Sequence, residues 1–567
     1  MNIVEVKKKL ILFLIISLFI FTSYIINVEK SASIISISAI VFLLLFYKSS
    51  NTLNINYNFI DLKRQYKTSI SIFWLFILTI ITQNVTLNFE TITWDVASYA
   101  VASNEISKGY IPFETQWESK GPILFYIYDG LFNLSNNNYI YFRLLNDLIL
   151  FIISMILFFT GKIIEKKRAL AGSLLSSTLF ILLMSKDWYV SEFSELYSLL
   201  FLSLAYYCYH TSINEKTKYI FIGIILSIAT LINQASVFFI IPFIWVSLIN
   251  NKKFIIGTKI KYLLFSFSLL HIFFVVLYYN NELLNVYFAN YITIPIGYTG
   301  ESLSSFYELR VWLRGFFDYN RFLFLSIFTL AISYLISNIF NIKKIIFGFN
   351  NYFLIIALSI YFIGSHNYYH HLFYFLYFTC FTIFYLKNSG YRIIVSIFIL
   401  FASASILLNS FTSSFKNLQS IEETYNDYPL LQLSREIDSK FQNDYSIFAL
   451  DYLFILNYLD KTNFSYIVHP MNHFEPFITE PLIKLNKITQ KNVLRLISLE
   501  PDVIICNSNM IIRGVKTKID VEYNCEVTDY LDNYYKLDTS EYRFNKNLFY
   551  YDDPTREINV YIKNESK

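Results

Sequence analysis

WDVASYAVASNEISKGYIPFETQWESKGPIL, residues 94–124, differs in composition from the chain around it. This polar run carries four carboxylates, whereas the 567-residue chain is 55% hydrophobic and only 16% charged. Soluble globular proteins average about 25% charged residues. The sequence therefore predicts a membrane protein in which residues 94–124 form a loop outside the lipid. So many charges beside a membrane span suggest that the loop contributes to an active site.

Apolar runs that predict membrane-spanning helices recur along the whole chain. Thirteen are expected, at 10–27, 32–47, 68–84, 142–161, 168–184, 194–209, 217–232, 235–249, 261–279, 321–339, 351–365, 369–387 and 391–409. One alternating set of connections is rich in Lys and Arg, which predicts that this set is cytoplasmic. The N-terminus is then cytoplasmic, and the loop 85–141 lies on the outer face of the cell (inner) membrane.

Three domains are predicted from these runs. Residues 1–67 form a transmembrane hairpin with a cytoplasmic loop, 68–415 a multi-pass core with a catalytic outer loop at 85–141, and 416–567 an extracytoplasmic α/β domain. In the last of these, the pattern predicts strands at 446–450, 464–468 and 502–506 with helices between them, which favours a small parallel sheet. Cys506 and Cys525 are candidates for a disulfide bond if this domain lies outside the cytoplasm.

Asp95 and Lys120 are the pair best suited to chemistry within the loop. Transfer of a sugar from a lipid-linked donor needs a base that takes a proton from the acceptor and a cation that stabilises the leaving phosphate. A carboxylate and a lysine at the bilayer surface meet these needs. The alternative for Asp95 is structural, because Asp is a favoured N-cap and the helix 96–107 would begin directly after it.

Two spacings in the loop resemble the first outer loop of C-type glycosyltransferases: Asp95-x3-Tyr99-x9-Gly109-x2-Pro112 and Trp117-Glu118-x-Lys120-Gly121-Pro122-x-Leu124. The closest similarity is to the bacterial branch that includes protein O-mannosyltransferases and lipid A aminoarabinose transferases. There the next span begins with Arg-Leu-Leu, as it does here at Arg143. The resemblance implies that Asp95 is the catalytic acid/base or a metal-site carboxylate, and that Lys120 and Arg143 contact the donor phosphate. Val96 stands where the family often has a second acid.

Other positions match the family more weakly. Glu195 fits an acid at the start of the span after the second outer loop, which makes it a second catalytic candidate; the alternative is a solvated acid at the membrane edge. His370 fits a family histidine, which implies a donor-phosphate contact; the alternative is a hydrogen-bonded structural histidine. The family's Thr-Lys-Gln appears here without its lysine, as Ile232-Asn233-Gln234. Further site candidates are Glu118, Glu192, Gln234 and Tyr99, whereas Glu105 and Glu114 are expected to be solvated.

The fold implied by the resemblance is an α-helical polytopic membrane protein of the C-type glycosyltransferase kind. Its activity would be hexosyl or pentosyl transfer from a polyprenyl-phosphate donor to an extracytoplasmic lipid, glycan or protein. Membrane lipids are the other expected partners, and nucleic acid is not expected. The cofactor is not set by the sequence; a divalent metal, if one is needed, would bind Asp95.

Two alternatives to a glycosyltransferase remain at this point. A transporter or flippase of lipid-linked glycans predicts charges within the spans. The predicted spans are nearly free of charge, and Asp147 is an exception. A non-catalytic envelope assembly protein would use residues 416–567 for binding and would not need Asp95 and Lys120.

Overall fold

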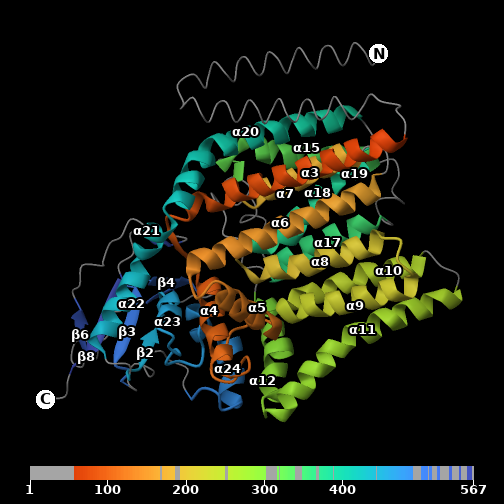
Figure 1. Ribbon diagram of the computed structural model, residues 1–567. Coiled ribbons are helices and arrows are strands. Elements are labelled where there is room, and N and C mark those ends of the chain that lie inside the picture. Colours follow the sequence, from red (N-terminus) through yellow and green to blue (C-terminus); the bar gives the residue numbers. More distant parts are fainter. Residues whose placement is uncertain are drawn as a thin grey trace.

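The computed structural model of the protein (Figure 1) describes residues 57–564 except 166–168, 186–191, 250–252, 302–315, 318, 339–347, 365–368, 387–388, 442–443, 490–499, 508–509, 514–519, 524–534, 539–547 and 551–557. The first two predicted spans lie outside these residues. A bundle of helices forms one part of the described chain, and a smaller part with strands lies at one end of it (Figure 1).

The eleven predicted spans that fall within the described residues all lie on helical elements. In chain order these are α3 (Tyr57–Gln83), α6 (Tyr139–Ile164), α7 (Ala169–Leu183), α8 (Ser194–His210), α9 (Glu215–Ile232), η2 (Gln234–Phe239) with α10 (Ile240–Ile249), α11 (Lys253–Asn280), α15 (Arg321–Asn338), α17 (Phe349–Gly364), η4 (Tyr369–Leu372) with α18 (Phe373–Cys380) and α19 (Thr382–Tyr385), and α20 (Ser389–Gln419). Shorter helical elements between these are η1 (Asn84–Thr86), α12 (Leu284–Phe288), η3 (Ala289–Thr293) and α13 (Ile294–Glu301).

Among the described residues, four helices are long and apolar enough to cross a bilayer by themselves: Tyr66–Thr86, Tyr139–Ile164, Gly257–Asn280 and Arg392–Gln419. Shorter apolar helices accompany them, so the protein is a multi-pass membrane protein. The number of thirteen spans stays a prediction. The predicted span 369–387 is not one continuous helix, because the 3-10 turn η4 precedes α18 and α19 follows it separately.

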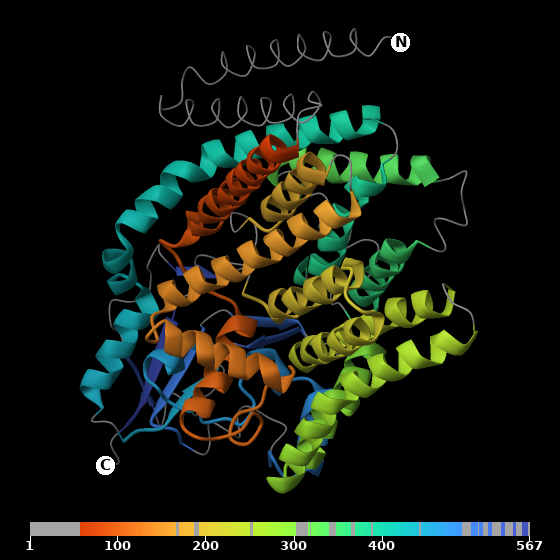
Figure 2. The ribbon, with the colours of Figure 1, turned by 45° about the vertical axis from the view of Figure 1, so that its right-hand side comes forward.

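The stretch 94–124 contains the helix α4 (Trp94–Ser107) and ends in the first turn of α5 (Pro122–Leu134). Thr93 is the N-cap of α4, since its side chain accepts a hydrogen bond from the Val96 N–H. Asp95 lies inside the first turn and does not cap the helix, which removes the structural alternative for this residue. Figure 1 shows α4 and α5 between the strands of the C-terminal part and the helices α8 and α9, and Figure 2 shows the same arrangement turned by 45°.

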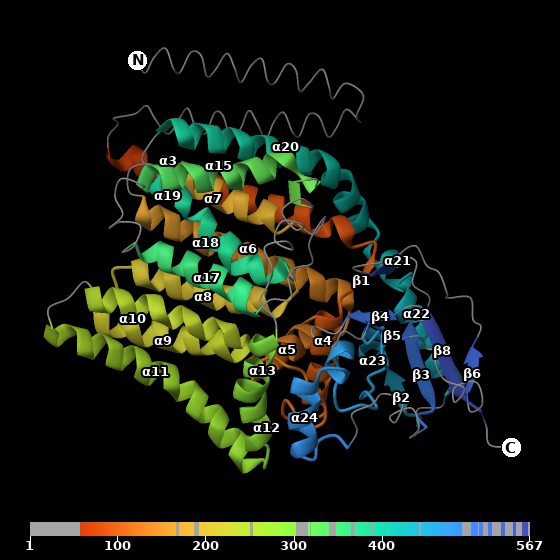
Figure 3. The same cartoon turned by 180° about the vertical axis from the view of Figure 1, so that it is seen from behind.

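The C-terminal part contains a four-stranded sheet in the order β2-β3-β8-β6 (Figure 3). The pair β2–β3 is parallel, as predicted, but β8 pairs antiparallel with both β3 and β6, so the sheet is mixed. The helices and strands of this part are α21 (Ile421–Asn426), α22 (Pro429–Lys440), β2 (Ile447–Ala449), α23 (Phe454–Tyr458), η5 (Pro470–His473), α24 (Pro476–Lys484), β3 (Val503–Asn507), β4 (Met510–Arg513), β5 (Asp520–Tyr523), β6 (Tyr535–Asp538), β7 (Leu548–Tyr550) and β8 (Ile558–Lys563).

The predicted strand at 464–468 does not join this sheet. Instead Ile467 forms an isolated parallel bridge with Trp117 of the outer loop. The Trp117 N–H donates to the Tyr466 carbonyl at 2.7 Å, and the Val468 N–H donates to the Trp117 carbonyl at 3.2 Å. A second link is β1 (Glu90–Ile92), which pairs in parallel with β7. The outer loop and the C-terminal part are therefore joined by backbone hydrogen bonds.

The cysteines of the described chain agree with a disulfide in this part. Cys506 is disulfide-bonded, whereas Cys208 and Cys380 are free thiols. The predicted partner, Cys525, lies outside the described residues.

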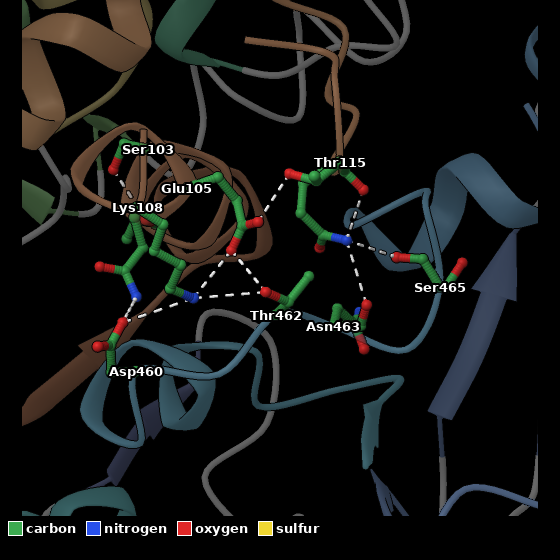
Figure 4. Close-up of polar contacts among 11 residues, drawn as sticks. Ser103, Glu105, Lys108, Thr115, Asp460, Thr462, Asn463 and Ser465 are labelled. Atoms are coloured by element: carbon green, nitrogen blue, oxygen red, sulfur yellow. Dashed lines mark hydrogen bonds and ion pairs between the residues drawn. The ribbon is translucent and has the colours of Figure 1, made fainter. Parts of the chain in front are cut away.

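Glu105, near the end of α4, forms a further contact between the outer loop and the C-terminal part (Figure 4). Its side chain is buried and accepts hydrogen bonds from the hydroxyls of Thr115 and Thr462, each at 2.7 Å. Lys108 lies 2.9 Å from the same carboxylate. The prediction that Glu105 is solvated is wrong, because the C-terminal part covers this face of α4. Glu114 is exposed, as predicted.

Glu90 is a fully buried carboxyl group in β1, and it makes stability depend on pH. Its oxygens accept hydrogen bonds from the Leu430 N–H at 2.7 Å and from the Tyr458 hydroxyl at 2.8 Å. Burial raises the pKa of Glu90 from 4.5 to about 8, against the effect of these hydrogen bonds. The folded protein thus keeps a proton that the unfolded chain releases. Stability from this group is full below pH 4.5 and falls as the pH rises toward about 8.

We expect Glu90→Gln to remove this part of the pH dependence, because glutamine fits the same space and does not titrate. The measurement is the thermal unfolding midpoint of the purified protein between about pH 5 and pH 8. Glu114→Gln, an exposed acid nearby in sequence, is the matched control and should keep the wild-type slope. Equal slopes for wild type and Glu90→Gln would contradict the prediction.

Candidate active site

Asp95 is the most exposed carboxylate of a cluster that also contains Glu118 and Glu195. The cluster lies where the C-terminal part meets the membrane helices. The Asp95 side chain is 27% exposed. The Tyr99 hydroxyl, one helical turn further along α4, donates to Asp95 Oδ1 at 3.4 Å. Tyr99 is buried, and burial raises the pKa of its hydroxyl well above the ordinary value, with the charges of Asp95, Glu195 and Glu118 adding to this effect. Three predicted site carboxylates therefore surround one tyrosine.

His469 reaches Asp95 from the C-terminal part. Its Nδ1 accepts the Met471 N–H at 3.2 Å, which leaves the hydrogen of a neutral imidazole on Nε2. Nε2 lies 3.6 Å from Asp95 Oδ1. The ring also meets Trp94 edge to face, with the ring centroids 5.9 Å apart. Sequence reasoning missed His469, because no spacing within the chain connects it to the outer loop.

Glu118 is the second carboxylate of the cluster, and it is buried. The Ser119 N–H donates to Oε1 at 2.8 Å, and the Asn472 side-chain amide lies 3.4 Å from Oε2. Burial raises the pKa of Glu118; Asp95 adds to the rise, whereas His469 and Lys120 oppose it. The sequence predicted Glu118 only as a further site candidate. The structure brings it together with Asp95 and Lys120.

Lys120 is placed by three hydrogen bonds to the backbone around it. The Asn290 amide donates to the Lys120 carbonyl at 2.8 Å, and the Gly121 N–H donates to the Ile232 carbonyl at 3.1 Å. The Gln234 amide donates to the Ser119 carbonyl at 3.3 Å. The charge of Lys120 acts on Glu118, Glu195 and His370, so its side chain lies among them. Gln234, a predicted site candidate, thus supports the lysine segment through the backbone.

Glu195 lies in the first turn of α8 and is 2% exposed, so it is not a solvated acid at the membrane edge. Its oxygens accept hydrogen bonds from the Asn233 amide at 2.9 Å and the Ser194 hydroxyl at 3.0 Å. His371 Nε2 lies 3.7 Å from Glu195 Oε1. His370 is buried and stacks on Phe193, with the ring centroids 4.2 Å apart. The predicted candidates Glu195 and His370 therefore lie together, and His371 joins them unpredicted.

Arg143 lies apart from this cluster and does not fit the predicted phosphate contact. Its guanidinium has no exposed surface and donates to the carbonyls of Thr86 and Phe89 and to the Thr86 hydroxyl. Its Nε is 3.9 Å from the buried carboxylate of Glu192, which is therefore an ion-pair partner of Arg143. Asp147, the predicted charge inside a span, also acts on Arg143 electrostatically. Arg143 therefore binds the backbone at the start of the loop 85–141, with two acids acting on its charge.

Comparison with known proteins agrees with the loop motif. The family model "Dolichyl-phosphate-mannose-protein mannosyltransferase" matches residues 119–279, from Ser119 to the end of α11. The crystal structure of ArnT from Cupriavidus metallidurans in the apo state is similar, with a TM-score of 0.52 and 10% identity, over 79% of this chain and 97% of ArnT. The structure of the same protein bound to undecaprenyl phosphate gives a TM-score of 0.50 and 10% identity, over 79% and 96%. No curated protein matches the chain significantly. The chain thus has the fold of ArnT, and its residues 119–279 are similar to the dolichyl-phosphate-mannose-protein mannosyltransferase family, in agreement with the resemblance to C-type glycosyltransferases.

Proposed function

We propose that the protein is a membrane glycosyltransferase that moves a sugar from a polyprenyl-phosphate donor to an acceptor on the outer face of the inner membrane. The observation that carries this proposal is the convergence of Asp95, Glu118, Lys120 and Glu195 where the C-terminal part meets the membrane helices. The match to a dolichyl-phosphate-mannose family model supports a lipid-phosphate donor. The ArnT structure with undecaprenyl phosphate supports the same class of donor.

Asp95 is the base in the proposed reaction. It takes the proton of an acceptor hydroxyl or amine as that group attacks the anomeric carbon of the donor sugar. The bond between this carbon and the phosphate oxygen breaks, and the phosphate leaves with the electron pair. Lys120 binds the phosphate as its negative charge develops. Direct displacement inverts the configuration at the anomeric carbon.

Asp95 and Glu118 are suited to different roles because their surroundings differ. Asp95 is partly exposed and open to an acceptor, whereas Glu118 is buried and its pKa is raised. Two nearby carboxyl groups in unlike environments are a common basis for separate ionisation states in one site. In our proposal Glu118 orients the Ser119–Lys120 segment and Asp95 accepts the proton.

We expect His469→Ala to lower kcat for sugar transfer about 10-fold while leaving KM for the donor unchanged, because His469 orients the Asp95 carboxylate and does not bind the donor. His469→Gln should recover part of the loss, since its amide can donate from nearly the same position. Steady-state kinetics with both variants test this positioning role. A change in KM alone, or no rescue by glutamine, would contradict it.

The overall assignment is tested with the purified protein in proteoliposomes and a panel of polyprenyl-phosphate sugars. We expect release of polyprenyl phosphate with at least one donor, together with a new glycan or lipid detected by mass spectrometry. The same surface molecules should be absent from cells that lack the protein. Cells that keep an unchanged set of surface glycans and lipids, together with no turnover of any donor, would overturn the proposal.

A further inference from the structure

Glu195, His370 and His371 bring three metal-binding atoms together on one side of the cluster. One carboxylate oxygen and one imidazole nitrogen from each histidine all lie within 4.8 Å of one another. The two histidines lie on the 3-10 turn η4, and their ring centroids are 4.4 Å apart with the rings at 83°.

The distance between Glu195 and His371 is closer to that of two ligands on one metal than to that of a hydrogen-bonded pair. Glu195 Oε1 and His371 Nε2 are 3.7 Å apart, which exceeds a normal hydrogen bond. Two ligands on one tetrahedral metal, each about 2.0–2.2 Å from it, lie about 3.4 Å from one another. We propose that Glu195, His370 and His371 form a binding site for a divalent transition metal of the zinc class.

The surroundings of Glu195 fit a metal ligand. The Asn233 amide donates to Oε1 and the Ser194 hydroxyl donates to Oε2, and the backbone N–H of Glu195 also bonds its own carboxylate. The two oxygens together have four lone pairs, so a position remains for a metal beside these three donors. Hydrogen bonds of this kind orient metal ligands and strengthen binding in known sites.

The ligand set selects the class of metal. Two imidazoles and one carboxylate suit zinc better than magnesium or calcium, which prefer oxygen ligands alone. Three protein ligands also leave a fourth position open, as in catalytic zinc sites. The positive charge of Lys120 acts on Glu195 and His370 and works against a cation there. The carboxylates of Asp95 and Glu118 lie in the same cluster and offset this charge.

The open position gives the site a use in sugar transfer, and this step rests on the proposed function. A phosphate oxygen of the donor would take the fourth position while Lys120 binds another oxygen of the same group. The metal would then act as a Lewis acid on the leaving phosphate. The metal site itself does not depend on this role.

Metal binding is measured on the full-length protein in detergent after treatment with a chelator. We expect Zn²⁺ alone to bind at one equivalent per chain and to raise the thermal unfolding midpoint, whereas Mg²⁺ does neither. Glu195→Gln and His371→Gln should each weaken Zn²⁺ binding by more than about 100-fold, because the loss of a supporting residue alone costs 10- to 100-fold. His271→Gln, which alters a partly buried histidine of α11 outside the cluster, should bind like wild type.

Absence of Zn²⁺ binding to the wild-type protein overturns the inference, even if the variants fold poorly. Equal affinity in wild type and Glu195→Gln overturns it as well. If Zn²⁺ binds but no donor is turned over, the metal site stands and the proposed function fails. If the metal-free wild type transfers sugar and binds no Zn²⁺, the proposed function stands and the metal site fails.

Discussion

Asp95→Asn is expected to reduce sugar transfer about 10²- to 10⁴-fold while the protein stays folded. Asparagine has the same shape and still accepts a hydrogen bond from Tyr99, but it cannot take a proton at neutral pH. The fold does not rely on the carboxylate as a cap, because Thr93 caps α4. An acid in the first turn of a helix adds only about 0.3–1 kcal/mol through the helix dipole. The loss should therefore appear in kcat and not in stability.

The measurement for Asp95→Asn is turnover of the polyprenyl-phosphate donor, with the thermal midpoint as a check of folding. Glu114→Gln removes an exposed carboxylate from the same loop and serves as the matched control, with turnover close to wild type. Full activity in Asp95→Asn would show that another group is the base. Equal losses in the two variants would point to the loop charge as a whole.

The parts of the site that the sequence could predict are those carried by local spacing or by family position. Asp95 and Lys120 stand in one loop whose motif is recognisable, and Glu195 stands at a fixed place at the start of a span. Their closeness to one another depends on helix packing, but the membrane restricts where each helix end lies. For this reason charges at those ends of separate spans that are predicted to face the same side were a useful signal.

The parts that the sequence could not predict depend on how the C-terminal part docks. His469 reaches Asp95 only because residues 466–468 pair with Trp117, and no periodicity marks such a bridge. Glu105 was expected to be a solvated helix residue. It is buried because Thr462, far along the chain, packs against it and donates to its carboxylate. Arg143, in contrast, was singled out by its motif, but its predicted contact was not found. A motif gives the residue type and not the groups that its guanidinium contacts.

The sheet topology was predicted only in part for a related reason. Alternating strands and helices favour parallel pairing, and β2–β3 follows that rule. The last strand, β8, then enters between β3 and β6 in the opposite direction. The residues of this strand, Ile558–Lys563, are mostly β-branched or aromatic, but they contain no information on which neighbours the strand pairs with.

Gly121→Ala is expected to destabilise the protein by about 3 kcal/mol and to abolish most of the transfer activity. A Cβ at this position would lie 2.0 Å from the Leu231 carbonyl oxygen and 2.4 Å from its carbon. Both are backbone atoms at the end of α9, so they cannot rotate away as a side chain would. The Gly121 N–H also donates to the Ile232 carbonyl, and a loop that moved back would lose this bond. Displacement of the loop would carry Lys120 away from Glu195.

Gly130→Ala is the matched control, because a Cβ on Gly130 in α5 meets nothing within 4 Å. Alanine is the better helix former, so this variant should be more stable by about 0.5–1 kcal/mol and fully active. Thermal midpoints and donor turnover of the two variants test the prediction side by side. If Gly121→Ala kept the midpoint and activity of Gly130→Ala, the close contact between the loop and α9 could not be what places Lys120. A lower midpoint with normal turnover would separate the two, since the contact would then stabilise the fold without positioning the lysine.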